Sequence, residues 1–255
     1  MEDVILKKLH EIEAEKGVKI LYACESGSRA WGFPSPDSDY DVRFLYACDL
    51  DWHLSLRDRK DSIDLPINEE LDINAWEIKK ALGLLWKSNA ALLEWLQSPI
   101  VYIHRPAFLN AIRDLADDCF SPIAAMHHYL TISKKYYEDC VGKSEIKLKR
   151  YFYALRTTIA GKWIRETGGR PKTEMVEMFD VIEEPVKERI LELIKLKAGK
   201  NEDYLHHEEP LITKFLGETI AANEQIANAL SSGKGNIDML EAFYREVVKG
   251  NYHDA

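Results

Sequence analysis

The sequence predicts an α+β fold: a small mixed sheet in the first third of the chain, followed by a helical region. Short β-branched and aromatic runs, separated by glycine and proline, occur within the first 105 residues. From about Ala107 onward, apolar residues recur at helical spacing. The length of 255 residues is ample for a core, and 46% hydrophobic with 30% charged residues is typical of a soluble globular protein. We expect two domains, residues 1–115 and a helical domain over residues 116–255.

The elements of the first third follow from their apolar periodicity and from the residues that interrupt it. Gly17 ends the first helical pattern, and Pro99 ends the last one. The glycines and prolines between residues 27 and 37 exclude a long regular element there. In chain order we predict a helix over residues 4–16, strands over 18–25 and 40–47, a short strand over 71–74, a helical segment from 75 to 98, and a late strand or buried turn over 100–104.

The remaining residues are predicted to be helical throughout. Ser121 is a suitable N-cap with Pro122 at the first helical position, and Gly168 with Gly169 stops a later helix. The predicted helices cover roughly residues 107–120, 121–141, 146–168, 173–198, 210–231 and 237–249.

Several classes of protein are disfavoured by composition. No window approaches the roughly 18 apolar residues of a membrane span. The N-terminal residues lack the apolar region of a signal peptide, so we expect a cytoplasmic protein without membrane contact. The four cysteines form no CxxC pair, and the adjacent histidines at 127–128 and 206–207 lack the spacing of a zinc site.

The charge is unevenly distributed along the chain. The net charge of −9 argues against indiscriminate binding of nucleic acid. Residues 131–172, however, contain eleven Lys and Arg against four Asp and Glu, whereas residues 174–209 contain eleven acids against five bases. The basic block indicates a localised place for phosphates; the alternative is a solvated helix face.

The segment from Gly27 to Asp41 carries the chemistry. Asp39 and Asp41 stand at the start of a strand, where residues i and i+2 point to one face, so their carboxylates would repel each other. Divalent cations resolve that repulsion, and two of them about 3.5–4 Å apart form the clamp used for displacement at phosphorus. Mg²⁺ fits best, with Mn²⁺ as an alternative, because it is hard and is commonly shared with phosphates.

The residues upstream of this pair provide the complementary half of the site. Gly27 allows close approach of the backbone to a phosphate, and Ser28 adds a hydroxyl donor. Arg29 adds a positive charge. Asp72 is the predicted third carboxylate because it alternates with apolar neighbours on the third strand, and Asp64 is its rival. Together these residues predict a site for a metal-chelated nucleoside triphosphate.

These motifs resemble the polymerase-β nucleotidyltransferase superfamily. More narrowly, the segments 27–46, 71–102 and 147–164 are similar to a bacterial and phage subfamily of predicted nucleotidyltransferases, some of which are linked to RNA ligases and RNA repair. The resemblance covers roughly residues 15–170. It implies Gly27 and Ser28 at the triphosphate and Asp39, Asp41 and Asp72 as metal ligands and catalytic residues.

The basic helical stretch after residue 146 extends this prediction. Lys147 and Arg150 are expected to bind the nucleotide, with Lys149 and Arg156 as weaker candidates, while the aromatic residues among them either face a base or belong to the core. Arg43 shares the predicted strand face of Asp39 and Asp41 and either orients a carboxylate, contacts a phosphate or balances charge. The expected activity is transfer of a nucleoside monophosphate to an acceptor hydroxyl. RNA is the favoured acceptor, and a protein side chain or a small hydroxylated molecule stays open. The competing hypothesis is a non-catalytic binding or regulatory module of the same fold.

Overall fold

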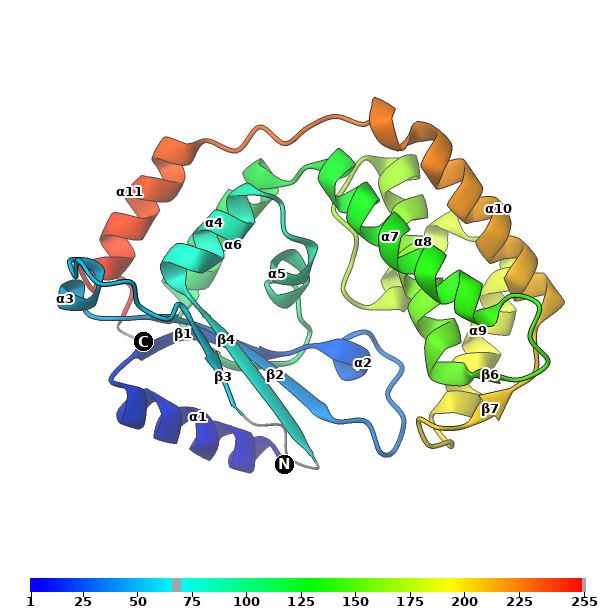
Figure 1. The fold of residues 1–255 in the computed structure, drawn as a ribbon, viewed down its shortest axis with the longest axis horizontal. Helices are drawn as coiled ribbons and strands as arrows, with labels where there is room; N and C mark the ends of the chain where they lie inside the picture. Colours follow the sequence, from blue (N-terminus) through cyan, green and yellow to red (C-terminus); the bar gives the residue numbers. More distant parts are fainter. Residues whose placement is uncertain (66–69, 254–255) are drawn as a thin grey trace. The chain divides into compact units, whose positions relative to one another are not determined.

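The chain folds into two compact units in a computed structural model that describes residues 1–65 and 70–253. The first unit comprises Met1–Gly27, Asp39–Phe120 and Lys234–Ala255, and the second comprises Ser28–Ser38 and Ser121–Gly233. Figure 1 gives the labels of the helices and strands. The change of unit at residue 120 lies near the predicted boundary after residue 115. The assignment of residues 28–38 and of the last 22 residues, however, does not follow a single cut of the chain.

A five-stranded mixed sheet forms the centre of the first unit. Its strand order is β3-β4-β2-β1-β5, with β2 and β4 parallel and the other neighbours antiparallel. The mixed sheet confirms the predicted fold class. The strands are β1 (Lys19–Glu25), β2 (Tyr40–Ala47), β3 (Ser62–Asp64), β4 (Leu71–Glu77) and β5 (Val101–His104).

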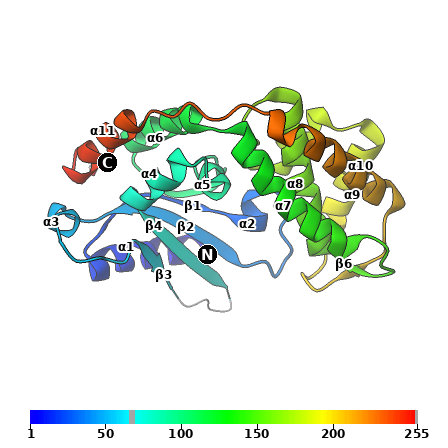
Figure 2. The same cartoon turned by 45° about the horizontal axis from the view of Figure 1, so that its top comes forward.

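Each face of the sheet has its own apolar core, because side chains alternate along every strand. Even-numbered residues of β2 such as Phe44 pack with Ile5, Leu9 and Ile12 of helix α1 (Glu2–Lys16). Leu45 faces the other way. Figures 1 and 2 show α1 on one side of the sheet and α4 with α6 on the other. The opposite core is covered by α4 (Ile78–Trp86), α5 (Ala90–Trp95), α6 (Pro106–Cys119) and α11 (Ile237–Val248).

The last helix returns to the first unit. Phe243 of α11 packs against Phe108 of α6 with ring centroids 5.6 Å apart, and the hydroxyl of Tyr244 contacts Nδ1 of His53 at 2.8 Å. His53 belongs to the short helix α3 (Leu50–His53), which had not been predicted. The C-terminal helix therefore completes a core that begins at residue 21.

The second unit is helical apart from a two-stranded antiparallel sheet. Its three principal helices are α7, α8 and α10, and Ser121 caps α7 as predicted by accepting a hydrogen bond from the Ala124 amide. The elements are α7 (Pro122–Cys140), β6 (Ile146–Lys147), α8 (Leu148–Thr167), the 3₁₀ helix η1 (Met175–Val181), α9 (Glu184–Lys197), β7 (Leu205–His206), α10 (Pro210–Ile226) and the 3₁₀ helix η2 (Ala227–Ala229).

The segment 28–38 packs against α8. Phe33 lies 4.8 Å from the Phe152 ring, Trp31 lies 5.3 Å from Tyr153, and the Trp31 carbonyl accepts a hydrogen bond from the Met175 amide. These contacts attach the segment to the helical unit even though its sequence lies between two strands of the sheet. The aromatic residues of α8 thus pack against other side chains. Of the two roles considered for them, facing a base or belonging to the core, the structure supports the core.

Two predicted helical segments are divided in the structure. The segment 75–98 begins as strand, because β4 continues to Glu77, and it is then interrupted at Ser88, whose φ is 54°. Asn89 caps α5 with its side chain. The segment 173–198 divides into η1 and α9, with Pro185 in the first turn of α9. In both cases the interruption occurs where a cap or proline favours a new start.

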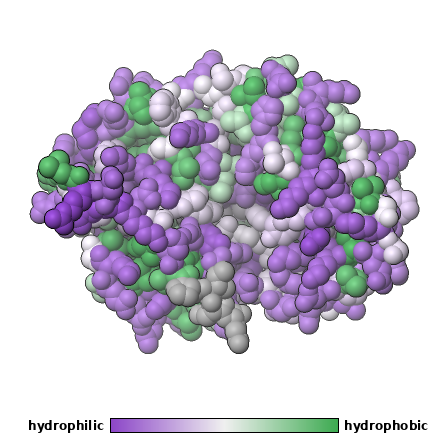
Figure 3. Space-filling view, viewed as in Figure 1, coloured by the Kyte–Doolittle hydropathy of each residue, from purple (hydrophilic) through white to green (hydrophobic). Residues whose placement is uncertain are grey.

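The face of the molecule drawn in Figure 3 is mostly hydrophilic, with scattered hydrophobic side chains. Among the described residues, no helix is both long enough and apolar enough to span a membrane.

Candidate active site

Asp41 and Asp72 lie opposite each other on neighbouring parallel strands. Asp41 of β2 pairs in register with Asp72 of β4, and the apolar residues that alternate with them, Val42 and Ile73, are buried against α1. Both carboxylates therefore project from the other face of the sheet. The structure thus brings together two of the three predicted carboxylates.

Arg43 bridges these two carboxylates. Its Nη2 donates to Asp41 Oδ1 at 2.8 Å and to Asp72 Oδ2 at 2.7 Å. Its Nη1 also donates to the Asp72 carbonyl oxygen at 2.9 Å. Of the alternatives considered for Arg43, the orientation of a carboxylate is the one that its hydrogen bonds support. The arginine also offsets the repulsion between two neighbouring negative charges.

The turn after β1 is shaped around Asp41. Gly27 has a φ of 62°, and a Cβ built on it would overlap Oδ2 of Asp41. The Ser26 amide donates to the Asp41 carbonyl oxygen at 2.8 Å. Glycine is therefore required here for two reasons, the left-handed backbone and the space that the carboxylate fills.

Glu25 is a site residue that the sequence analysis missed. Its carboxylate is fully buried, accepts the Asp41 amide at 2.8 Å and also accepts the hydroxyl of Tyr102. Burial, followed by the hydrogen bond to Glu25, raises the pKa of Tyr102. Glu25 thus fixes the backbone of Asp41 by accepting its amide hydrogen. A glutamate at the end of an otherwise apolar strand was the one available signal.

Asp39 lies outside the strand ladder. Strand β2 begins at Tyr40, so Asp39 is an exposed residue of the preceding irregular stretch, and the i, i+2 argument does not fix its direction. In the described part of the chain, no group of three or more Asp, Glu, His or Cys side chains is arranged to hold a metal ion.

The Asp41–Asp72 pair nevertheless fits the chemistry of Mg²⁺. The pair offers hard carboxylate oxygens, the ligands that this ion prefers. Gly27 leaves room for Oδ2 of Asp41, whereas Arg43 holds the other oxygen, Oδ1. The two carboxylates therefore suit a divalent cation, whereas Asp39, the third predicted ligand, is not part of the pair.

Ser28 and Arg29 belong to the second unit. The Ser28 hydroxyl donates to Ser38 Oγ at 3.1 Å, and Arg29 Nη2 donates to the Ser38 carbonyl oxygen at 2.7 Å. Both residues therefore brace the turn that leads from the Gly-Ser pair to Asp39. The unit boundary falls between Gly27 and Ser28, so the predicted phosphate-binding pair contributes one residue to each unit.

The two predicted nucleotide-binding cations, Lys147 of β6 and Arg150 of α8, are paired with acids. Lys147 forms an ion pair with Asp203, and Arg150 forms one with Asp139 at 3.1 Å; Asp139 is half-buried and the other three side chains are exposed. Lys149, a weaker candidate, pairs instead with Glu202, which accepts a hydrogen bond from Ser38. Lys149 is therefore connected to the Gly-Ser segment through Glu202 and Ser38, whereas the ion pairs of Lys147 and Arg150 do not reach that segment.

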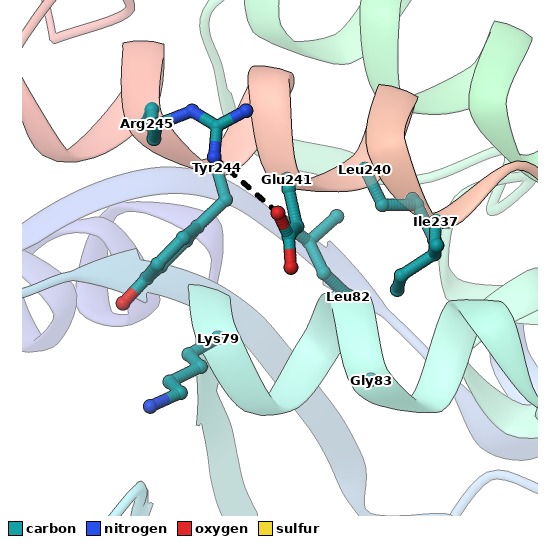
Figure 4. A pocket seen from close by; sticks show the side chains of 8 residues that line it. All are labelled: Lys79, Leu82, Gly83, Ile237, Leu240, Glu241, Tyr244 and Arg245. Atoms are coloured by element: carbon teal, nitrogen blue, oxygen red, sulfur yellow. Dashed lines mark hydrogen bonds and ion pairs between the residues drawn. The ribbon is translucent and has the colours of Figure 1, made fainter.

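The remaining candidates lie elsewhere. Asp64, the rival of Asp72, is exposed on edge strand β3, where it pairs with Lys60 at 3.0 Å. His206 forms a hydrogen bond with Glu209, with 2.7 Å between Nε2 and Oε1. A cavity of about 400 Å³ lies between α4 and α11 and is lined by apolar side chains and by the ion pair of Glu241 with Arg245 (Figure 4). None of the predicted site residues lines that cavity.

With this geometry in hand, comparison with known proteins identifies the chain as a nucleotidyltransferase of the polymerase-β type. It belongs to the RNA repair pathway DNA polymerase beta family, whose model matches residues 1–246. This confirms the resemblance found in the sequence.

Two similar proteins extend the comparison. The chain is 39% identical over 236 residues to the uncharacterized protein YcgL of Bacillus subtilis (strain 168), which covers 92% of this chain and 91% of that protein. A nucleotidyltransferase-like protein from Exiguobacterium sibiricum 255-15, known from a crystal structure, aligns over 96% of this chain and 80% of its own, with 11% identity and a TM-score of 0.31.

Proposed function

We propose that the protein transfers a nucleoside monophosphate from a nucleoside triphosphate to an acceptor hydroxyl and releases pyrophosphate. The observation that carries this proposal is the Asp41–Asp72 pair, held in register by the sheet and bridged by Arg43, in a chain of this family. A buried strand ladder fixes both carboxylates before any ligand arrives, which is the kind of preorganisation that catalysis at phosphorus needs.

Asp41 and Asp72, joined by Asp39, would hold Mg²⁺ in this proposal, with two ions as the expected number. The ions would supply neutralisation of the negative charge that develops on the reacting phosphate. Asp72 would accept the proton of the attacking hydroxyl at Oδ1, because its Oδ2 already accepts a hydrogen bond from Arg43.

The chain's own residues also position the nucleotide. Gly27, with its left-handed backbone, would bring the main chain close to a phosphate, and the Ser28 hydroxyl would donate to a phosphate oxygen. Arg29 holds the turn through the Ser38 carbonyl. Lys147 and Arg150 remain proposed nucleotide contacts, for which an anion would have to replace Asp203 and Asp139.

RNA is the acceptor that we propose. The family description names an RNA repair pathway, and the second unit carries the basic block of residues 131–172. A protein side chain or a small hydroxylated molecule would need other contacts than this block supplies. The competing proposal is a non-catalytic module, in which the Arg43 bridge would serve stability alone.

A transfer assay with matched variants distinguishes these proposals. Purified protein is incubated with each α-³²P-labelled nucleoside triphosphate, Mg²⁺ and an RNA with a free 3′ hydroxyl, and labelled RNA and pyrophosphate are measured. Asp41→Asn should lower the rate by ~10²-fold or more, as expected for loss of a group that acts on developing charge. Asp64→Asn, which removes a carboxylate from the edge strand of the same sheet, should leave the rate unchanged. Equal rates for wild type and Asp41→Asn would contradict the catalytic proposal and favour the non-catalytic module.

A further inference from the structure

The segment that follows α9 is attached to the turn preceding Asp39. Glu202 is the centre of this contact: its Oε1 accepts a hydrogen bond from Ser38 Oγ at 2.9 Å, and its amide donates to Asp37 Oδ1 at 3.0 Å. Five residues earlier, Lys197 donates to Ser35 Oγ at 2.8 Å. All of these residues belong to the second unit.

The contact continues to the serine of the Gly-Ser pair. Ser28 Oγ donates to Ser38 Oγ, which in turn donates to Glu202 and accepts the Ser35 amide at 3.0 Å. Ser28 and Ser38 are both buried. A hydroxyl has one donor hydrogen, so the hydrogen bonds run in one direction, from Ser28 through Ser38 to the carboxylate. The last acceptor of this series of hydrogen bonds is the Glu202 carboxylate, which is an anion.

One cation contacts this anion directly, and the charge of a second is influenced by it. Lys149 forms an ion pair with the other carboxylate oxygen of Glu202. Lys197 is almost fully buried, and burial lowers its pKa, while the negative charge of Glu202 acts in the opposite direction. Hydroxyl donors and lysines around one oxygen anion are the partners that a phosphate group would also use.

Glu202 is within reach of the solvent. Its side chain is 25% exposed and that of Lys149 is 39% exposed, so a dissolved anion can approach both. The carboxylate is on a segment without regular structure between α9 and β7, and it can leave without unwinding a helix.

We propose that Glu202 is an internal anion that holds the place of a phosphate group in the free protein, and that a nucleoside triphosphate must displace it from Ser38 and Lys149. This inference rests on the proposed function and deepens it. On displacement, Lys149 transfers its ion pair to the phosphate, and Ser28 and Ser38 become donors to phosphate oxygens. Glu202 thereby sets the affinity for the triphosphate and rejects weaker anions.

Binding of inorganic tripolyphosphate and of ATP tests this proposal on the full chain. Isothermal titration calorimetry compares wild type with Glu202→Gln and Glu218→Gln. Glu218 is the matched control, because the same change removes one negative charge of the second unit from an exposed i, i+4 pair with Lys214 on α10, outside the basic block. Glu202→Gln should bind both ligands roughly three- to tenfold more tightly, since the internal competitor is lost. Glu218→Gln should change the affinity by less than about twofold, as expected for an exposed ion pair.

Each remaining outcome decides one point. Lys149→Met should weaken tripolyphosphate binding; an unchanged affinity would contradict transfer of the ion pair. Equal tightening in Glu202→Gln and Glu218→Gln would reduce the effect to net charge and overturn the proposal. If Glu202→Gln unfolds, Glu202→Asp withdraws the carboxylate by one methylene and should change affinity in the same direction. A wild type that binds ATP normally and a Glu202→Gln that binds no better would overturn the displacement alone. Absence of binding in every protein would overturn the phosphate site itself.

Discussion

Replacement of Arg43 by methionine tests whether the two carboxylates depend on one cation. The substitution keeps most of the aliphatic length but removes the guanidinium that donates to Asp41 Oδ1 and Asp72 Oδ2. A hydrogen bond to a charged group contributes about 1.5–3 kcal/mol. More than a quarter of each aspartate side chain is exposed to solvent, which weakens these hydrogen bonds. We therefore expect the loss of both bonds to lower the free energy of unfolding by about 2–4 kcal/mol in total.

Urea unfolding of matched variants measures this loss. The control is Arg245→Met, which removes an exposed i, i+4 pair with Glu241 on α11 of the same unit and should cost about 0.3–0.5 kcal/mol. A loss in Arg43→Met no larger than that in Arg245→Met would refute the bridging role.

A second substitution, Asp72→Asn, adds a test in which the predicted change in stability has opposite signs in two backgrounds. With Arg43 present, Asp72→Asn removes an acceptor and should destabilise the protein. In the Arg43→Met background, the same change removes one of two uncompensated negative charges and should stabilise it. An equal effect of Asp72→Asn in both backgrounds would show that the carboxylates do not share the arginine.

Two further predictions concern the first unit. Gly27→Ala should lower transfer activity by at least about tenfold, because its Cβ would displace the carboxylate of Asp41. Gly17→Ala is the control: Gly17 has the same left-handed backbone, at a cost of about 1–2 kcal/mol, but no atom lies within 4 Å of the added Cβ, so full activity should remain. Equal activities of Gly27→Ala and Gly17→Ala would refute the claim that the Cβ at residue 27 displaces Asp41. Burial raises the pKa of Glu77 to about 7 from 4.5, so the folded state favours its protonated form, and stability should fall as the pH rises from about 4.5 to 7. Burial also lowers the pKa of the neighbouring His53, which changes stability in the opposite sense, so the difference between wild type and Glu77→Gln isolates the glutamate. A difference that stays constant from pH 4.5 to 7 in urea unfolding would contradict this assignment.

The parts of the site that follow from period-two alternation could be predicted from the sequence. Once residues 40–47 and 71–74 form strands with apolar residues on one face, the face of Asp41, Arg43 and Asp72 is determined. The parallel register that places Asp41 beside Asp72 could not be predicted, because it depends on the pairing of strands from separate parts of the chain. The motif thus predicts which residues form the site, and the sheet determines which of them lie together.

Contacts over long sequence separations account for what the sequence analysis missed. Glu25 meets Tyr102 across 77 positions, and Ser38 meets Glu202 across 164. Neither pair leaves a periodic signal, since one residue of each lies at a strand end or in a turn. The attachment of residues 28–38 to the helical unit could not be predicted for the same reason. Trp31 and Phe33 lie in a turn, and nothing in the local sequence indicates that they pack against α8.

The charge asymmetry of the sequence has a structural explanation within the second unit. Cations of the basic block meet acids of the following segment in three ion pairs, Lys147 with Asp203, Lys149 with Glu202 and Lys162 with Glu183. The excess of bases over residues 131–172 nearly equals the excess of acids over residues 174–209. Under the proposed function, a phosphate would have to replace a carboxylate at each such lysine, and the net gain per contact would be smaller than for a bare basic surface. Such a site would favour a ligand that replaces several carboxylates together, such as a triphosphate or an RNA backbone, over a ligand with a single phosphate.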